Sequence, residues 1–258
     1  MIKNCLRPKL GEGRPVVGCF VNVESPAIVE ILGLCGVEFV VVDAEHNPIL
    51  AHDSINYYRA AESAGIPAIT RIGENSQQVI AKYMDVGCAG VMMPMVNSAE
   101  DAKRVVDAVK YPPMGTRGLA GVRAAGYGLD GPLAAHVEQA NENSTVVVQI
   151  ETMQAVERAD EIIATEGVDV VFLGPTDLSV ALGVHGQTRH PKVLETIEAL
   201  TKKINAAGKM AGTIARDAQD YAYWRDRGMG FFLTGASNLL AAGAKEYVES
   251  IKAVEEGR

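Results

Sequence analysis

Eight short apolar runs alternate with longer amphipathic segments along this sequence, and no other feature constrains the fold as strongly. Short apolar runs bounded by turn residues are typical of buried strands, whereas the longer segments carry apolar residues at helical spacing. The predicted strands are residues 16–21, 38–43, 67–72, 90–94, 145–151, 169–173, 209–214 and 230–234. The predicted helices are residues 25–35, 52–64, 75–86, 98–110, 132–142, 153–165, 191–207, 217–227 and 237–255.

Eight strand-then-helix steps predict parallel strands with right-handed crossovers, and closure into a (β/α)8 TIM barrel is the usual outcome at this number. The length of 258 residues agrees, because such a barrel takes about 250 residues. An open doubly wound sheet is the alternative, but no GxGxxG follows the first predicted strand. We therefore expect a single α/β domain over residues 1–258.

The net charge and hydropathy of the chain limit the kinds of molecule that it can bind. The formal net charge of -8 argues against nucleic acid or an anionic membrane as a partner. No run approaches the roughly 18 apolar residues of a membrane span, and residues 1–13 lack the apolar core of a signal peptide, so we expect a cytoplasmic protein. Cys5, Cys19, Cys35 and Cys88 are widely spaced, which predicts reduced, mostly buried thiols rather than disulfides or a zinc site.

Acidic side chains follow two neighbouring predicted strands. Glu151 ends the strand in TVVVQIET, and Asp177 lies just past the strand in VDVVFLGPTDLS. Because strand side chains alternate, Gln149 and Glu151 share one face, and a barrel strand that turns polar at its carboxyl end is typical of a catalytic one. We hypothesise that Glu151 and Asp177 hold a divalent metal. The alternative is two solvated acids at a strand end and a helix start.

Two further strands end in charged residues. Asp43 ends the second predicted strand and is followed by Glu45 and His46, and Arg71 lies at the end of the third. A guanidinium suits a carboxylate, so we interpret Arg71 as binding an anionic substrate that it shares with the metal. The alternative is an internal salt bridge between Arg71 and Asp43 that only holds the barrel rim.

Four segments together resemble a known family. VVDAEHNP, GVMMPMVNSAEDAKRVVDAVKYPPMGTRG, VVVQIET and GVDVVFLGPTDLS resemble, in order and spacing, the class II (metal-dependent) 2-oxo-acid aldolases of the HpcH/HpaI family, such as 4-hydroxy-2-oxoheptanedioate aldolase and 2-dehydro-3-deoxyglucarate aldolase. The resemblance covers nearly the whole chain and is densest over residues 37–183. It implies a (β/α)8 barrel of the pyruvate- and phosphoenolpyruvate-handling type, and reversible cleavage of a 4-hydroxy-2-oxo acid into pyruvate and an aldehyde. It also implies a homohexamer, a trimer of dimers, with the last helix (about 237–255) exchanged between neighbours.

The same resemblance assigns roles to individual residues. It implies that Glu151 and Asp177 bind the metal, that Arg71 binds pyruvate and that Gln149 forms a hydrogen bond with the 2-oxo acid beside the metal. It implies that His46 is the catalytic histidine and that Asp85 is its acidic partner, although Asp85 lies near the end of a predicted helix. The substrate carboxylate would bind to backbone groups at a helix start, in the segment that runs from Gly174 through Pro175 and Thr176 to Asp177.

Reaction chemistry supports a metal. Breaking the C3–C4 bond leaves an enolate, which needs a positive partner. A lysine Schiff base could supply it, but no lysine ends a predicted strand. All-oxygen ligation suits Mg²⁺ or Mn²⁺, with Co²⁺ as a further candidate. Histidine is a common general base, so either His46 or a metal-bound water takes the C4 hydroxyl proton.

The longest irregular stretch, residues 111–131, contains Arg117 and Arg123. We expect this loop to leave the fourth strand on the active rim and to shape the aldehyde pocket or a subunit contact, with Arg123 as the partner of a distal acid group. The alternative is a glycine-rich structural lid with solvated arginines. Three functions remain open: a class II aldolase, another carbon–carbon lyase or synthase on the same pyruvate–metal site, and a non-enzymatic carboxylate-binding protein.

Overall fold

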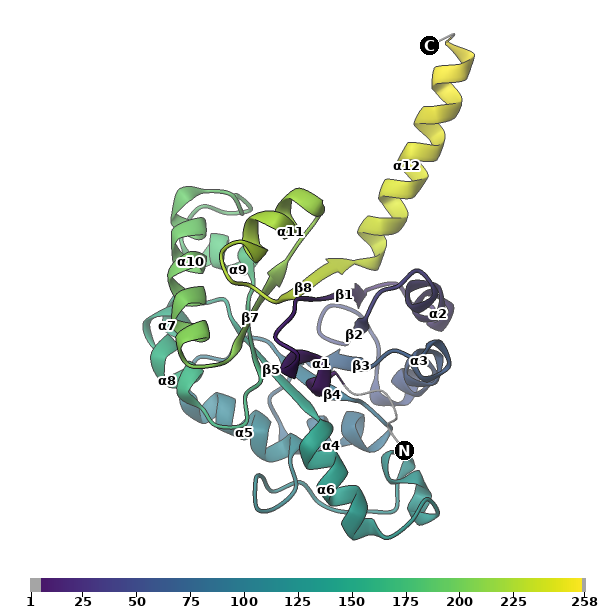
Figure 1. The fold of residues 1–258 in the computed structure, drawn as a ribbon, viewed down its shortest axis with the longest axis vertical. Helices are drawn as coiled ribbons and strands as arrows, with labels where there is room; N and C mark the ends of the chain where they lie inside the picture. The colour runs from purple at the N-terminus through teal and green to yellow at the C-terminus, as the bar shows by residue number, and fades with distance from the viewer. Residues whose placement is uncertain (1–5, 257–258) are drawn as a thin grey trace.

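The computed structural model describes residues 6–256 and confirms the predicted barrel (Figure 1). Eight parallel strands pair in chain order, and β8 closes onto β1. The strands are β1 Val16–Val21, β2 Phe39–Asp43, β3 Ala68–Arg71, β4 Gly90–Met93, β5 Thr145–Ile150, β6 Val170–Leu173, β7 Met210–Ile214 and β8 Phe231–Gly235. The helices are α1 Arg7–Gly11, α2 Pro26–Leu34, α3 Ala51–Ala64, α4 Gln77–Asp85, α5 Ala99–Val109, the 3-10 helix η1 Arg123–Gly128, α6 Leu133–Asn143, α7 Met153–Glu157, α8 Ala159–Ala164, α9 Pro175–Ala181, α10 Pro191–Ala206, α11 Ala218–Arg225 and α12 Ala236–Glu255.

All eight predicted strands are present, and each end lies within one residue of its predicted position. The helix predicted over residues 153–165 is two helices, α7 and α8, because Arg158 between them leaves helical geometry at φ -102° and ψ 16°. Three short helices, α1, η1 and α9, are not predicted. The helix α9 matters most, because it places Asp177 in the first turn of a helix, in agreement with the helix start expected at Gly174 to Asp177.

Two apolar layers result from the alternation of side chains along the strands. Val40 and Val42 of β2 pack outward against the surrounding helices, whereas Val41 packs into the barrel interior. Aromatic rings fill that interior: the ring centroids of Phe39 and Phe231 are 4.7 Å apart. The barrel is therefore a packed core, as in other barrels of this type, and polar chemistry gathers at the strand ends.

The loop of residues 111–131 lies at the amino-terminal end of the barrel, which overturns the expectation that it borders the active rim of its own chain. It follows helix α5 rather than strand β4, so it belongs to a helix-to-strand connection. Arg123 donates to the backbone carbonyl of Val86, just past α4, and pairs with Glu62 near the end of α3. Arg117 is not solvated either, because its side chain is 1% exposed and pairs with Asp85.

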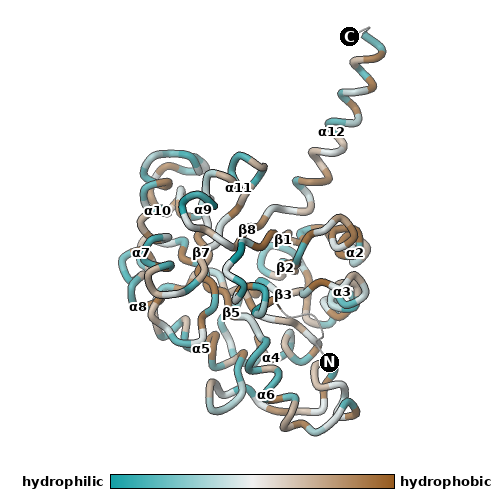
Figure 2. Tube along the Cα trace, in the orientation of Figure 1, coloured by the Kyte–Doolittle hydropathy of each residue, from teal (hydrophilic) through white to brown (hydrophobic). Residues whose placement is uncertain are grey.

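Helix α12 projects away from the barrel (Figure 1). Two hydrogen bonds between Asn22 and Ser237 fix its start, but Ala236 is its one buried residue in the described part of the chain. Hydrophobic residues recur along its whole length (Figure 2), and Leu240, Tyr247 and Val254 are 64–79% exposed. The last helix therefore does not pack its apolar stripe on its own barrel.

Three of the four cysteines lie in the described part of the chain. Cys19 and Cys88 are free and buried, Cys35 is free and exposed, and Cys5 lies outside the described residues. Among residues 6–256, no helix combines the length and apolar character needed to cross a membrane.

Candidate active site

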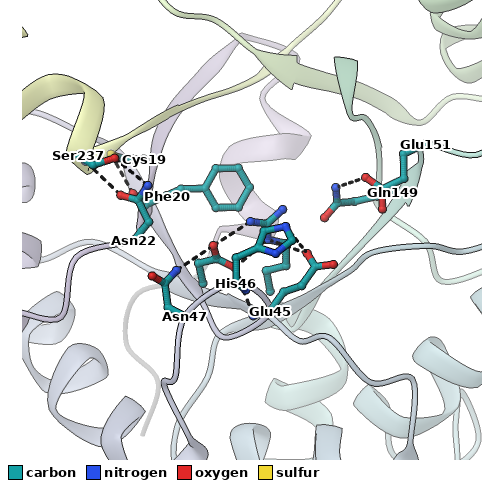
Figure 3. A network of polar contacts seen from close by, with 11 residues as sticks. Cys19, Phe20, Asn22, Glu45, His46, Asn47, Gln149, Glu151 and Ser237 are labelled. Atoms are coloured by element: carbon teal, nitrogen blue, oxygen red, sulfur yellow. Dashed lines mark hydrogen bonds and ion pairs between the residues drawn. The ribbon is translucent and has the colours of Figure 1, made fainter. Parts of the chain in front are cut away.

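A pocket of about 420 Å³ opens at the carboxyl ends of the strands. Its lining brings together most of the residues predicted for the site: Asp43, His46, Arg71, Gln149, Gly174, Pro175, Thr176 and Asp177. They converge because the carboxyl ends of parallel barrel strands meet on one face. Figure 3 shows Glu45 and His46 from the β2–α3 turn across from Gln149 on β5 and Glu151 just past it.

Two carboxylates and an aromatic ring hold the Arg71 side chain in place. Its Nε and Nη2 donate to the two carboxylate oxygens of Asp43 at 2.9 and 2.8 Å, and its Nε also lies 3.2 Å from Glu45. The guanidinium stacks 4.5 Å from the centroid of the Phe20 ring. Its Nη1 has no hydrogen-bond partner within residues 6–256. The internal salt bridge foreseen as the alternative is therefore present, and it orients Arg71 while leaving one nitrogen available to a ligand.

Asp43 also folds the turn that carries His46. Its Oδ1 accepts from the backbone N–H groups of Glu45 and His46, and its Oδ2 accepts from the side-chain amide of Asn47. An aspartate whose side chain accepts from backbone N–H groups two or three residues further along the chain fixes a turn in this way. The His46 side chain is 65% exposed at the rim of the pocket, with Nε2 3.7 Å from the Glu45 carboxylate.

Glu151 is a buried carboxylate with two donors. Its Oε1 accepts from the backbone N–H of Met95 at 2.8 Å, and its Oε2 accepts from the side-chain amide of Gln149 at 2.9 Å. Burial raises the pKa of Glu151 to about 7, against the lowering effect of the Met95 hydrogen bond, and the charges of Asp177 and Glu45 raise it further. Burial likewise raises the pKa of Glu45, against the lowering effect of the charges of Arg71 and His46, and the charges of Asp43 and Asp177 raise it further. Three acids therefore repel one another across this part of the site.

These residues fit a divalent cation. A buried carboxylate whose neighbours disfavour its charge is stabilised by a positive ion. The Oε1 of Gln149 is buried and has no hydrogen-bond partner among the described residues, so an acceptor oxygen is left over beside Glu151. Carboxylate and amide oxygens are ligands that Mg²⁺ and Mn²⁺ prefer. Within residues 6–256, no cluster of three or more His, Cys, Asp or Glu side chains forms a closed metal cage.

Asp85 is the one predicted site residue that a single chain does not bring to the others. It ends α4, whose carboxyl end leads into β4, so it lies at the amino-terminal end of the barrel, opposite to His46. Its Oδ1 accepts from Nη2 of Arg117 at 2.9 Å. The partnership between Asp85 and His46 stays a prediction, and it requires a second copy of the chain.

Sequence reasoning missed other residues of the pocket lining. Asn22 follows β1 and Arg216 follows β7, while Asn238 lies in the first turn of α12. The signal that pointed to Arg71, a polar residue where a barrel strand ends, applies equally to Asn22 and Arg216.

A closed (β/α)8 barrel that gathers an arginine and paired acids at the carboxyl ends of its strands defines a TIM-barrel enzyme. The particular family follows from comparison with known proteins. The family model described as HpcH/HpaI aldolase/citrate lyase matches residues 16–244, and the chain belongs to this family. It is a carbon–carbon lyase of the aldolase type.

Two relatives of known name match this chain over most of its length and of theirs. The chain is 34% identical to a 5-keto-4-deoxy-D-glucarate aldolase of Escherichia coli O157:H7, over 86% of this chain and 87% of the relative. It is also 34% identical to a 2-keto-3-deoxy-L-rhamnonate aldolase of Salmonella gallinarum, over 93% and 90%. Among solved structures, an HpcH/HpaI aldolase from Desulfitobacterium hafniense superposes with a TM-score of 0.91 at 33% identity, covering 96% of this chain and 97% of that one.

Proposed function

We propose that the enzyme cleaves a 4-hydroxy-2-oxo acid reversibly into pyruvate, or a related 2-oxo acid, and an aldehyde, with a divalent cation held by Glu151 and Asp177. The observation that carries this proposal is the buried Glu151 carboxylate, whose pKa is raised to about 7 next to Asp177 and which has no cationic side chain paired with it in the described chain. When bound, Mg²⁺, Mn²⁺ or Co²⁺ would supply the positive charge that stabilises an enolate.

Arg71 would bind the carboxylate of the 2-oxo acid. Asp43, Glu45 and Phe20 fix its guanidinium before any ligand arrives, so little conformational entropy is lost on binding. The start of α9 offers further donors. Pro175 has no N–H, but the N–H groups of Thr176 and Asp177 lie in the first turn, where a helix leaves its donors without internal partners.

His46 would handle the proton of the C4 hydroxyl. Its exposed imidazole stands at the rim of the pocket, beside Glu45 and across from Glu151 (Figure 3). In cleavage it would take the hydroxyl proton, directly or through a water, and the same group or water can later return a proton to C3. The contribution of Asp85 to this step depends on a neighbouring chain.

We also propose a homohexamer, a trimer of dimers, in which α12 is exchanged between neighbours. The exposed apolar residues of α12, including Leu240, Tyr247 and Val254, support this proposal, because a solvent-exposed stripe of this kind is stabilised by packing on another surface. A cytoplasmic location would keep the free thiols of Cys19 and Cys88 reduced.

A pyruvate-release assay tests the proposal. The full chain is offered a panel of 4-hydroxy-2-oxo acids with Mg²⁺, Mn²⁺, Co²⁺ or a chelator, beside Arg71→Ala and a control, Asp160→Asn, whose carboxylate is 78% exposed and pairs with Lys203. We expect metal-dependent release that Arg71→Ala abolishes and Asp160→Asn retains. Full release in the presence of the chelator would refute the metal-dependent reaction.

A further inference from the structure

Met95 has a backbone conformation that its residue type does not favour. It lies two residues past β4 at φ 53°, in the left-handed region that glycine adopts far more easily than a residue with a long side chain. Within residues 6–256, Tyr127 is the one other non-glycine residue with a positive φ. The Met95 side chain is 54% exposed, so its packing does not hold this conformation. The backbone groups of the turn and their partners hold it instead.

Three hydrogen bonds tie the turn after β4 to the segment that carries Glu151. The backbone N–H of Met95 donates to Oε1 of Glu151 at 2.8 Å, and the N–H of the next residue donates to the carbonyl of Gln149 at 3.3 Å. In the third bond, the Thr152 hydroxyl donates to Oδ1 of Asn97. The turn and the end of β5 are therefore fixed relative to each other on both sides of the Glu151 carboxylate.

The side chain of Asn97 connects the two halves of this junction. Its amide nitrogen donates to the carbonyl of Met95 at 2.9 Å, while its Oδ1 accepts from Thr152. Asn97 is itself anchored, because its backbone N–H donates to Oδ2 of Asp101 in the first turn of α5 at 3.0 Å. Thr152 is anchored as well, since its Oγ1 caps α7 by accepting from the N–H of Ala155 at 3.0 Å. Two helix starts therefore fix the amide that holds the Met95 carbonyl.

The φ angle of Met95 sets the direction of its N–H relative to its carbonyl. If φ relaxed to the ordinary negative range, the two peptide groups would rotate relative to each other. The N–H could then no longer reach Glu151 while the carbonyl stayed on Asn97. Unfavourable backbone conformations persist only where surrounding contacts impose them, and they gather at functional sites.

We propose that Asn97 is a positioning residue for the metal site. It keeps Met95 in the left-handed conformation, and the Met95 N–H in turn fixes Oε1 of Glu151. The other carboxylate oxygen, Oε2, which lies beside Gly174, is then the one offered to the cation. This inference rests on the proposed metal site and adds a residue that acts on it through Glu151.

The test measures Mn²⁺ binding by chains that differ at positions 95 and 97. Asn97→Ala should weaken binding about tenfold to a hundredfold, the usual effect of removing a group that orients a metal ligand. Adding Met95→Gly should restore the affinity to within about threefold of the unmodified chain, because glycine adopts the left-handed conformation without help from Asn97. Adding Met95→Ala in its place should restore nothing, since alanine disfavours that conformation as methionine does.

The two double variants form a matched pair, because glycine and alanine both remove the methionine side chain. A difference between them therefore reports the backbone conformation and not the lost side chain. Electron paramagnetic resonance gives the free Mn²⁺, and the spectrum of the bound ion should change in Asn97→Ala and return with Met95→Gly. Urea unfolding checks that every chain is folded. Asn143→Ala, which removes an exposed amide bound to the carbonyl of Gln139, should keep the affinity of the unmodified chain.

Each possible failure has its own meaning. Equal Mn²⁺ affinities for Asn97→Ala and the unmodified chain would overturn the positioning role and leave the metal site standing. Equally weak binding by the two double variants would show that the conformation of Met95 is not how Asn97 acts, which also overturns the proposal. An unmodified chain that binds no Mn²⁺ would refute the metal site and this inference together.

Discussion

The Oε2 atom of Glu151 lies 2.8 Å from the point where a Cβ on Gly174 would stand. Gly174 is the residue before α9, and its backbone at φ -79° and ψ 98° is open to any residue, so the need for glycine here is one of space. Because Gly174 has no Cβ, the short turn from β6 to α9 can pass close to the Glu151 carboxylate on its way to Asp177. The proposed metal pair depends on this close approach.

Gly174→Ala should therefore weaken Mn²⁺ binding at least tenfold while the chain stays folded. The added methyl group would displace the Glu151 carboxylate or push α9 away from it. Calorimetric titration with Mn²⁺ measures the affinity, and circular dichroism checks the fold. Gly118→Ala is the matched control, since nothing lies within 4 Å of a Cβ at that position. Equal affinities for Gly174→Ala and Gly118→Ala would contradict the prediction.

Asp43→Asn should raise KM for pyruvate by about tenfold or more. The change removes one of two charge-assisted bonds to Arg71 and loosens the turn that carries His46. Steady-state kinetics of aldol addition with varied pyruvate measures the effect. An unchanged KM would mean that Arg71 needs no support from Asp43.

Lys110 makes stability depend on pH. Burial lowers the pKa of Lys110 from its ordinary value of 10.5 to about 8, while its Nζ donates to the backbone carbonyls of Asn141 and Ser144. Between these two pKa values the unfolded chain holds a proton at Lys110 that the folded chain has lost, so this residue makes the free energy of unfolding rise with pH there. Relative to Lys110→Met, the unmodified chain should gain about 3 kcal/mol between pH 7.5 and 10.5.

Urea unfolding of both chains at each pH measures that gain. Taking the difference between the two chains removes the contributions of other groups that titrate in the same range, such as the buried tyrosines. A difference that stays constant with pH would show that Lys110 keeps its ordinary pKa.

Removing α12 should reduce the size of the assembly. A chain that ends at Ala236 keeps the helix's one buried residue in the described part of the chain and loses the exposed Leu240, Tyr247 and Val254. Light scattering should give a smaller particle than for the full chain, because the apolar stripe would no longer pack on a neighbour. The same particle size for both chains would refute helix exchange.

The strands and most of the site could be predicted because both depend on local patterns. Apolar runs bounded by turns define each strand, and polar residues at the strand ends must meet once the strands are parallel, which brings Arg71, Gln149 and Asp177 together. A helix start was expected at Gly174, but the extent of the short helix α9 was not predicted, because GPTDLS is also typical of a turn.

Long-range relationships could not be predicted in this way. Residues 111–131 follow α5 rather than β4, so they lie at the opposite end of the barrel from the rim where the sequence analysis places them. The pairings of Arg117 with Asp85 and of Arg123 with Glu62 join segments 32 and 61 residues apart, and no spacing rule reveals them. The raised pKa of Glu151 likewise depends on burial that only the folded chain creates.

Binding of Mn²⁺ to the unmodified chain, Glu151→Gln and Asp177→Asn tests the central claim most directly. Electron paramagnetic resonance reports free Mn²⁺, and pyruvate release is followed in the same samples. The account predicts one Mn²⁺ per unmodified chain, binding weakened about a hundredfold in each variant, and release of pyruvate lost in parallel. Binding as tight in both variants as in the unmodified chain would contradict it.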